Sequence, residues 1–127
     1  MKTKPVLCAA DVDAILAGAR AEAVANGWAV TIAVADDGGH LLGLARLDGA
    51  APLSSYIGPE KARTSALGRR ESKVSEDIIN QGRTAFLSAP MVQGMLEGGV
   101  PIVIDGQVIG AVGVSGVKSD QDAQIAR

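Results

Sequence analysis

Opposite charges gather where the first predicted strand pair ends. In Arg46-Leu47-Asp48 the two charged side chains stand two residues apart, so both point to one side of a strand. Lys61 follows in a segment with helical spacing. The planar fork of an arginine suits carboxylates, and a lysine or aspartate beside a reacting atom moves protons. We predict that Arg46, Asp48 and Lys61 converge on an anionic small molecule, with Lys61 and Asp48 as candidate catalytic groups. The alternative is a local salt bridge that holds the loop.

Three further residues are candidate ligand contacts. Gly98-Gly99 either presents backbone N–H groups to an anion or forms a tight turn. His40 is either a ligand or general base that titrates near neutral pH, or a turn residue facing solvent. No Walker or dinucleotide-binding spacing, Ser-His-acid arrangement, His-Glu-x-x-His pair or cysteine pair occurs, so neither a nucleotide site nor a metal site is predicted.

The bulk properties restrict the class of protein. A chain of 127 residues predicts one domain, spanning 1–127. The net charge is −2 and no basic stripe occurs, which argues against nucleic acid as a partner. The single Cys8 excludes an internal disulfide. No apolar run is long enough to span a membrane, and Asp11 and Asp13 interrupt the first one too early for a signal peptide. We therefore expect a cytoplasmic protein without a membrane partner.

Two hairpins predict most of the sheet. Asp105-Gly106 lies between two β-branched runs and suits a type I′ turn, which indicates strands at 100–104 and 107–115. An upstream pair at 28–35 and 40–47 surrounds residues 36–39. Both faces of 107–115 are uncharged, so both should be covered. One of those faces is nearly bare of side chains, so a helix or a ligand must come close to the backbone.

Helical spacing predicts the layers around this sheet. Helices are expected at 9–26, at 59–70 with Pro59 in the first turn, at 75–82, and from residue 119 onward. Residues 84–97 are ambiguous, and a short strand near Met95 is one interpretation. Hairpins between helices indicate a three-layer α/β/α sandwich of the profilin-like kind, an α+β fold around an antiparallel sheet.

Several segments then resemble the GlcG/HbpS family, which also forms the C-terminal domain of PduO-type proteins. The matching pieces cover nearly the whole chain; they are Gly39–Leu42 with Arg46–Ala50, Lys61–Ala66, Gly98–Pro101, Gly106–Gly116 and Asp120–Ala123. The resemblance implies a central five-stranded antiparallel sheet and homo-oligomers from dimer to octamer. It also implies haem binding in some members, with a secreted branch that binds iron and degrades haem. Members are often encoded beside catabolic enzymes.

This chain departs from the haem-degrading branch in two ways. It shows no export signal, and where that branch carries a His in its C-terminal acidic turn, this chain has Asp122-Ala123. The only imidazole is His40, so an axial haem ligand would be His40, a Met, Cys8 or Tyr56. We therefore expect weak haem binding or none, and the cofactor stays open.

Three functions are consistent with these residues. The first is a small-ligand-binding accessory protein of a catabolic pathway, with an anionic molecule or cofactor at Arg46, Asp48 and Lys61. The second is a small enzyme doing acid–base chemistry on a carboxylated or carbonyl metabolite, and the third is a haem-binding protein. A purely structural oligomer fits least, because glycines and charges gather at strand ends. In every case an Ala- and Gly-rich sandwich with three aromatic residues, Trp28, Tyr56 and Phe86, predicts a homo-oligomer, at least a dimer.

Overall fold

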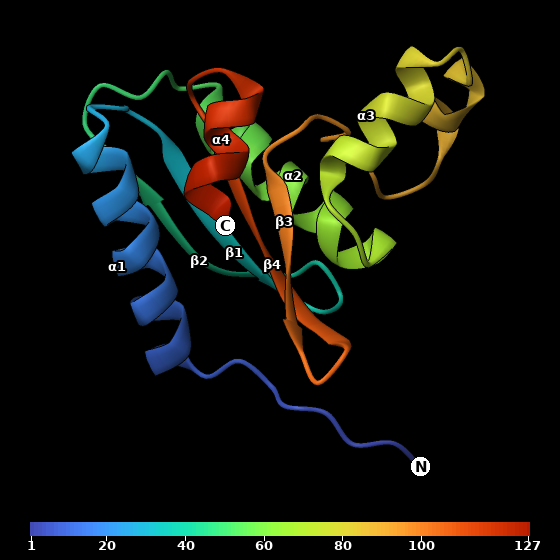
Figure 1. Ribbon diagram of the computed structural model, residues 1–127, viewed down its shortest axis with the longest axis horizontal. Helices are drawn as coiled ribbons and strands as arrows, with labels where there is room; N and C mark the ends of the chain where they lie inside the picture. The colour runs from blue at the N-terminus through green and yellow to red at the C-terminus, as the bar shows by residue number, and fades with distance from the viewer.

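A computed structural model describes residues 1–127 and shows helices on both sides of one sheet (Figure 1). The helices are α1 (Ala9–Ala25), α2 (Ser54–Gly68), α3 (Ser72–Asn80) and α4 (Ser119–Ala126), with a 3₁₀ helix η1 (Thr84–Ser88). The strands are β1 (Thr31–Asp36), β2 (Leu41–Arg46), β3 (Gly99–Ile104) and β4 (Gln107–Ser115). None of the helices combines the length and the apolar run that crossing a bilayer requires.

The sheet is antiparallel throughout, in the strand order β2-β1-β4-β3. Its two hairpins confirm the predicted strand pairs, and positive φ angles of 50° at Asp105 and 74° at Gly106 fit the predicted turn. The expected fifth strand is wrong, because the sheet has four strands. The segment around Met95 packs on α2 instead of on a strand. Gly94 lies so close to that helix that a Cβ on it would stand 2.5 Å from the carbonyl carbon of Glu60.

The two faces of the sheet are covered differently. On one face α1 and α4 enclose an aliphatic cluster, whose buried members are Val12, Ala19, Ala23, Val30, Ile32, Val34, Val112, Val114, Ile125 and Ala126. On the other face α2 lies almost on the backbone. A Cβ on Gly113 would clash with the carbonyl oxygen of Gly58 and the amide nitrogen of Ala62. The bare face of β4 is therefore explained by a close helix, one of the two predicted alternatives.

Helix α2 begins at Ser54, not at Pro59 as predicted, so Pro59 and Lys61 lie beyond its first turn. The predicted loop before this helix is correct at Pro52, which lies in a turn, and wrong at Gly58, which lies in α2. The hydroxyls of Ser54 and Thr31 lie 2.7 Å apart and join the first turn of α2 to β1. Helix α3 likewise begins at Ser72 and not at Ser75. In α2 the charged side chain of Lys61 is buried, whereas in α3 the buried residues are Ser72 and Ser75.

Candidate functional site

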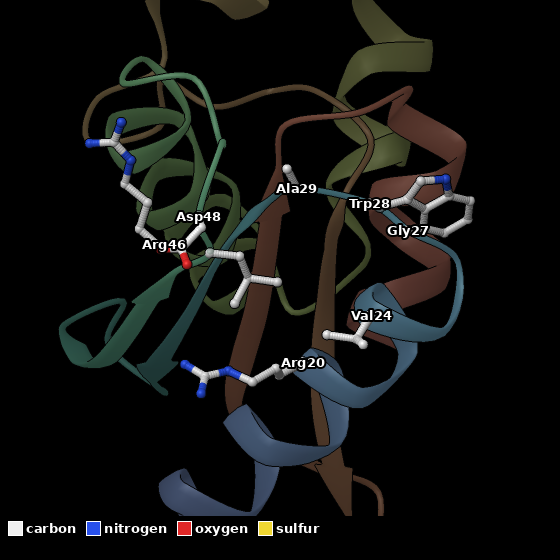
Figure 2. A pocket seen from close by; sticks show the side chains of 8 residues that line it. Arg20, Val24, Gly27, Trp28, Ala29, Arg46 and Asp48 are labelled. Atoms are coloured by element: carbon white, nitrogen blue, oxygen red, sulfur yellow. The ribbon is translucent and has the colours of Figure 1, made fainter.

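A hollow of about 550 Å³ opens where α1 ends and β2 runs out (Figure 2). Its walls come from the end of α1, the link to β1 and the residues after β2. The lining residues are Arg20, Val24, Gly27, Trp28, Ala29, Arg46, Leu47 and Asp48. Two of the predicted site residues, Arg46 and Asp48, therefore share one hollow. Lys61 does not line it.

The end of β2 sets the position of Arg46. This residue lies opposite Thr31 in the antiparallel pair, and one of its terminal nitrogens, Nη2, donates a hydrogen bond to the carbonyl of Ala50 at 3.0 Å. The turn that brings Ala50 back uses Gly49 at a φ of 85°, which a side chain would disfavour. A guanidinium has five N–H donors, so most of its donors stay available to a ligand.

Two lining residues were missed by the sequence analysis. Arg20 reaches toward the hollow from α1, and the indole of Trp28 stands on the opposite side from Arg46 (Figure 2). The signal for Trp28 was its position directly after the helix stop Asn26-Gly27, where a large side chain is left half-buried. The signal for Arg20 was weaker, because a lone arginine on a helix surface is usually solvated.

The charges around the hollow are uncompensated within the chain. Arg20, Arg46 and Asp48 form no ion pair. Two guanidinium groups against one carboxylate leave an excess of one positive charge at this opening. A hollow with an excess of positive charge suits an anionic molecule, and Figure 2 shows that the Trp28 indole points away from both arginines.

Lys61 lies elsewhere and is fully engaged. Its ammonium donates to the carbonyl of Val114 and to Oδ2 of Asp122, each at 3.0 Å. Lys61 is 2% exposed and Asp122 is 1% exposed. The Lys61 side chain thus connects α2 to β4 and α4. Its predicted catalytic and ligand-binding roles, like those of Asp48, stay predictions.

Asp122 lies in the first turn of α4, within the segment that the sequence predicts as helical from residue 119 onward. Its second oxygen also accepts the N–H of Val117 at 3.2 Å. Burial raises the pKa of Asp122, and the Lys61 ammonium and the Val117 N–H offset only part of that rise. Nothing in the local sequence announces this pair, because 61 positions separate the two residues.

Gly98 and Gly99 lie next to the buried Lys61. Gly98 has a φ of 134°, and a Cβ on it would lie 2.8 Å from the Lys61 Nζ. The N–H of Gly99 donates to the Ser72 hydroxyl at 2.7 Å. These contacts match the tight-turn alternative, since the Gly99 N–H already has a partner within the chain. An anion-binding role for Gly98 and Gly99 stays a prediction.

His40 sits at the β1–β2 turn, with 80% of its side chain exposed. Its Nδ1 lies 3.1 Å from Oδ1 of Asp36, and the same oxygen accepts the backbone N–H groups of Gly38 and His40. Asp36 therefore organises the turn, and the imidazole rests against it. His40 is not part of the hollow at Arg46. Across the chain, no three His, Cys, Asp or Glu side chains come together as a metal site would require.

Comparison with known proteins agrees with this architecture. The family model described as "Haem degrading protein HbpS-like" matches residues 7–127. Protein GlcG of Escherichia coli K12 is 60% identical over 115 residues, which cover 91% of this chain and 85% of that protein. A solved double mutant of Streptomyces reticuli HbpS superposes with a TM-score of 0.88 at 26% identity, covering 100% and 86% of the two chains.

A haem complex is also among the solved relatives. A solved PduOC:heme complex superposes with a TM-score of 0.85 at 25% identity, over 96% of this chain and 91% of the other. The family match over almost the whole chain, the 60% identity and the shared fold all point to one assignment. The chain belongs to the HbpS-like family.

Proposed function

We propose that this chain is a small-ligand-binding accessory protein of a catabolic pathway that holds an anionic small molecule in the hollow at Arg46. One observation carries the proposal: Arg20 and Arg46 lack an ionic partner and line the same hollow as the only tryptophan. Unpaired guanidinium groups at the rim of a hollow are typical of sites that bind carboxylates.

The hollow suggests how such a molecule is held. The donors of Arg46 not used by Ala50 bind a carboxylate in a fork, and the apolar lining residues Val24 and Leu47 contact the apolar part of the ligand. Asp48, on the same rim, accepts a hydrogen bond from a ligand hydroxyl or amine. Lys61 contributes indirectly, because it fixes β4 and α4 and does not touch the ligand.

A thermal-shift screen of small organic acids tests this proposal. We expect at least one carboxylic acid to raise the unfolding temperature of the wild-type protein and to lose that effect in Arg46→Ala. Arg83→Ala is the matched control, because Arg83 is an exposed arginine outside the hollow. Equal shifts in wild type and Arg46→Ala would contradict the site. Chemical conversion of the bound acid, lost in Asp48→Asn, would favour the enzymatic alternative.

Haem is the second candidate, supported by the solved PduOC:Heme relative. Of the residues that offer an axial ligand, Cys8, His40, Tyr56, Met1 and Met91 are exposed, and Met95 is buried with 5% exposure. A haem would therefore be held by a surface group and supply its own redox chemistry there. We expect weak binding in a hemin titration followed by the Soret band. A tight, saturable complex that disappears in His40→Ala would rank haem first.

A further inference from the structure

The hollow at Arg46 continues into a furrow between α1 and β2. This furrow has a volume of about 530 Å³ and shares two lining residues, Arg20 and Val24, with the hollow. Its other lining residues are Asp13, Leu16, Ala17, Ala21, Leu44 and Ala45. All of these except Asp13 are apolar, so the charged hollow opens onto an apolar furrow. One bound molecule can therefore extend from the hollow into the furrow.

The packing of α1 on β2 sets the shape of the furrow. The two elements are in close contact at Gly43, where a Cβ would stand 2.7 Å from Cγ1 of Val12 and 3.2 Å from Cδ1 of Leu16. Ala45 points to the same face of the strand as Gly43 and lines the furrow. Helix and strand therefore touch at one end of the furrow and are separated at the other end, where β2 runs out into the hollow.

The charges differ between the two ends of the furrow. Arg20 lies at the end shared with the hollow, and Asp13 lies two helical turns earlier in α1, about 10 Å along the helix axis. Neither side chain forms an ion pair within the chain. A carboxylate is attracted to the Arg20 end, whereas a second carboxylate at the far end is repelled by Asp13. The furrow therefore suits a molecule with one anionic end and an uncharged chain.

The lining of the furrow favours an aliphatic chain over a flat ring. Its apolar side chains are left open to water, since Val24 is 67% exposed and Leu44 is 39% exposed. An alkyl chain lying over them removes apolar surface from water, which favours binding. No aromatic residue lines the furrow, and the Trp28 indole points away from both arginines (Figure 2), so a ring finds no stacking partner there.

We propose that the ligand is an unbranched aliphatic monocarboxylate, with its carboxylate at Arg46 and Arg20 and its chain in the furrow along α1. The separation of about 10 Å between the levels of Arg20 and Asp13 matches an extended chain of about eight carbons. Asp13 is then a specificity-determining residue that disfavours dicarboxylates. This inference rests on the proposed function, because it assigns a chain to the acid that the hollow binds.

Calorimetric titration with butanoate, hexanoate and octanoate tests the chain site. We expect the affinity to rise about twofold with each added methylene, because an open furrow removes about half of the surface of each methylene from water. Octanedioate should bind about tenfold more weakly than octanoate, because its second carboxylate meets Asp13. Asp13→Asn should reduce that difference. 1-Octanol, which has the same chain without the charge, should bind at least about tenfold more weakly than octanoate.

A steric variant gives a second, independent measurement. Ala17→Trp places a bulky side chain in the furrow and should remove the advantage of octanoate over butanoate. Ala14→Trp is the matched control, because Ala14 is exposed on the same helix but does not line the furrow, and it should keep that advantage. Circular dichroism checks that every variant is folded.

The outcomes separate the chain site from the anion site. Equal affinities for butanoate and octanoate in the wild type, or an octanoate advantage that survives Ala17→Trp, overturn the chain site. The proposed function stands in that case if Arg46→Ala still abolishes binding of both acids. Failure of all three acids to bind, or equal binding by wild type and Arg46→Ala, overturns the proposed function and the chain site together.

Discussion

The two pairs of opposite charge that bear on function, Arg46 with Asp48 and Lys61 with Asp122, have opposite fates in the fold. Arg46 and Asp48 are two residues apart in sequence, lie at an open hollow and form no ion pair. Lys61 and Asp122 are 61 residues apart, almost fully buried and in direct contact. The two charges that are close in the sequence are therefore unpaired, whereas the two that are distant in the sequence form a buried ion pair.

The difference shows what each pair can do. A buried ammonium must satisfy its charge and its donors internally, because desolvation costs more than an unpaired charge can recover. Lys61 meets this condition with one carboxylate and one carbonyl, and so fastens three elements together. Arg46 is solvated and partly unengaged, so it can exchange water for a ligand at little cost.

The largest expected effect is on stability at the buried pair. Lys61→Met leaves the Asp122 carboxylate buried without its cation, which should cost about 3–5 kcal/mol of unfolding free energy. Urea denaturation measures it. Lys61→Met/Asp122→Asn should recover a large part of the loss, because it removes both charges and keeps an acceptor for the Val117 N–H. If Lys61→Met lowers the unfolding free energy no more than a surface substitution does, the buried pair does not stabilise the fold and the contrast with Arg46 and Asp48 is wrong.

At the hollow, the expected effect is on binding and not on folding. Arg46→Ala should weaken binding of the anion found in the screen about tenfold to a hundredfold, since charge-assisted hydrogen bonds contribute about 1.5–3 kcal/mol. The same change should cost only about 1 kcal/mol of stability, from the bond to Ala50. Calorimetric titration and urea denaturation separate the two quantities. A stability loss as large as that of Lys61→Met would show that Arg46 is a structural residue.

The pH dependence of stability should single out Asp122. Its pKa in the folded protein is raised above the ordinary 3.8, so between the two values the folded state binds more protons than the unfolded chain. The contribution of this carboxyl to stability therefore increases as pH falls through the raised pKa and is lost as pH rises. Relative to Asp122→Asn, the wild type should gain stability between pH 7 and pH 4. If the wild type instead loses stability relative to Asp122→Asn as the pH falls, the pKa of this carboxyl is lowered in the folded protein and the prediction is wrong.

The smallest effect is expected at the turn. His40 is mostly exposed, so His40→Ala should change the unfolding free energy by about 0.5 kcal/mol or less. A urea midpoint measured beside that of Arg46→Ala tests this expectation. A loss of several kcal/mol would mean that the turn, with Asp36, supports the fold as strongly as the buried pair does.

Much of the fold followed from local patterns. The Asp105-Gly106 turn and the alternation of β-branched residues predicted both hairpins, because turn conformation and side-chain period are local properties. The same patterns failed at Met95, where packing against α2 prevents a strand, and at Pro59, which local rules place at a helix start although Ser54 begins the helix. In each case a contact with a distant element outweighed the local preference.

By itself the sequence determined the antiparallel hairpins, the family and the charged strand end at Arg46 and Asp48. Only the tertiary structure decided that Lys61 is buried against Asp122 and that Arg20 and Trp28 line the same hollow as Arg46. The reason is physical. Turn geometry and side-chain alternation depend on neighbours in the chain, whereas desolvation of a charge and the walls of a hollow depend on which distant segments pack together.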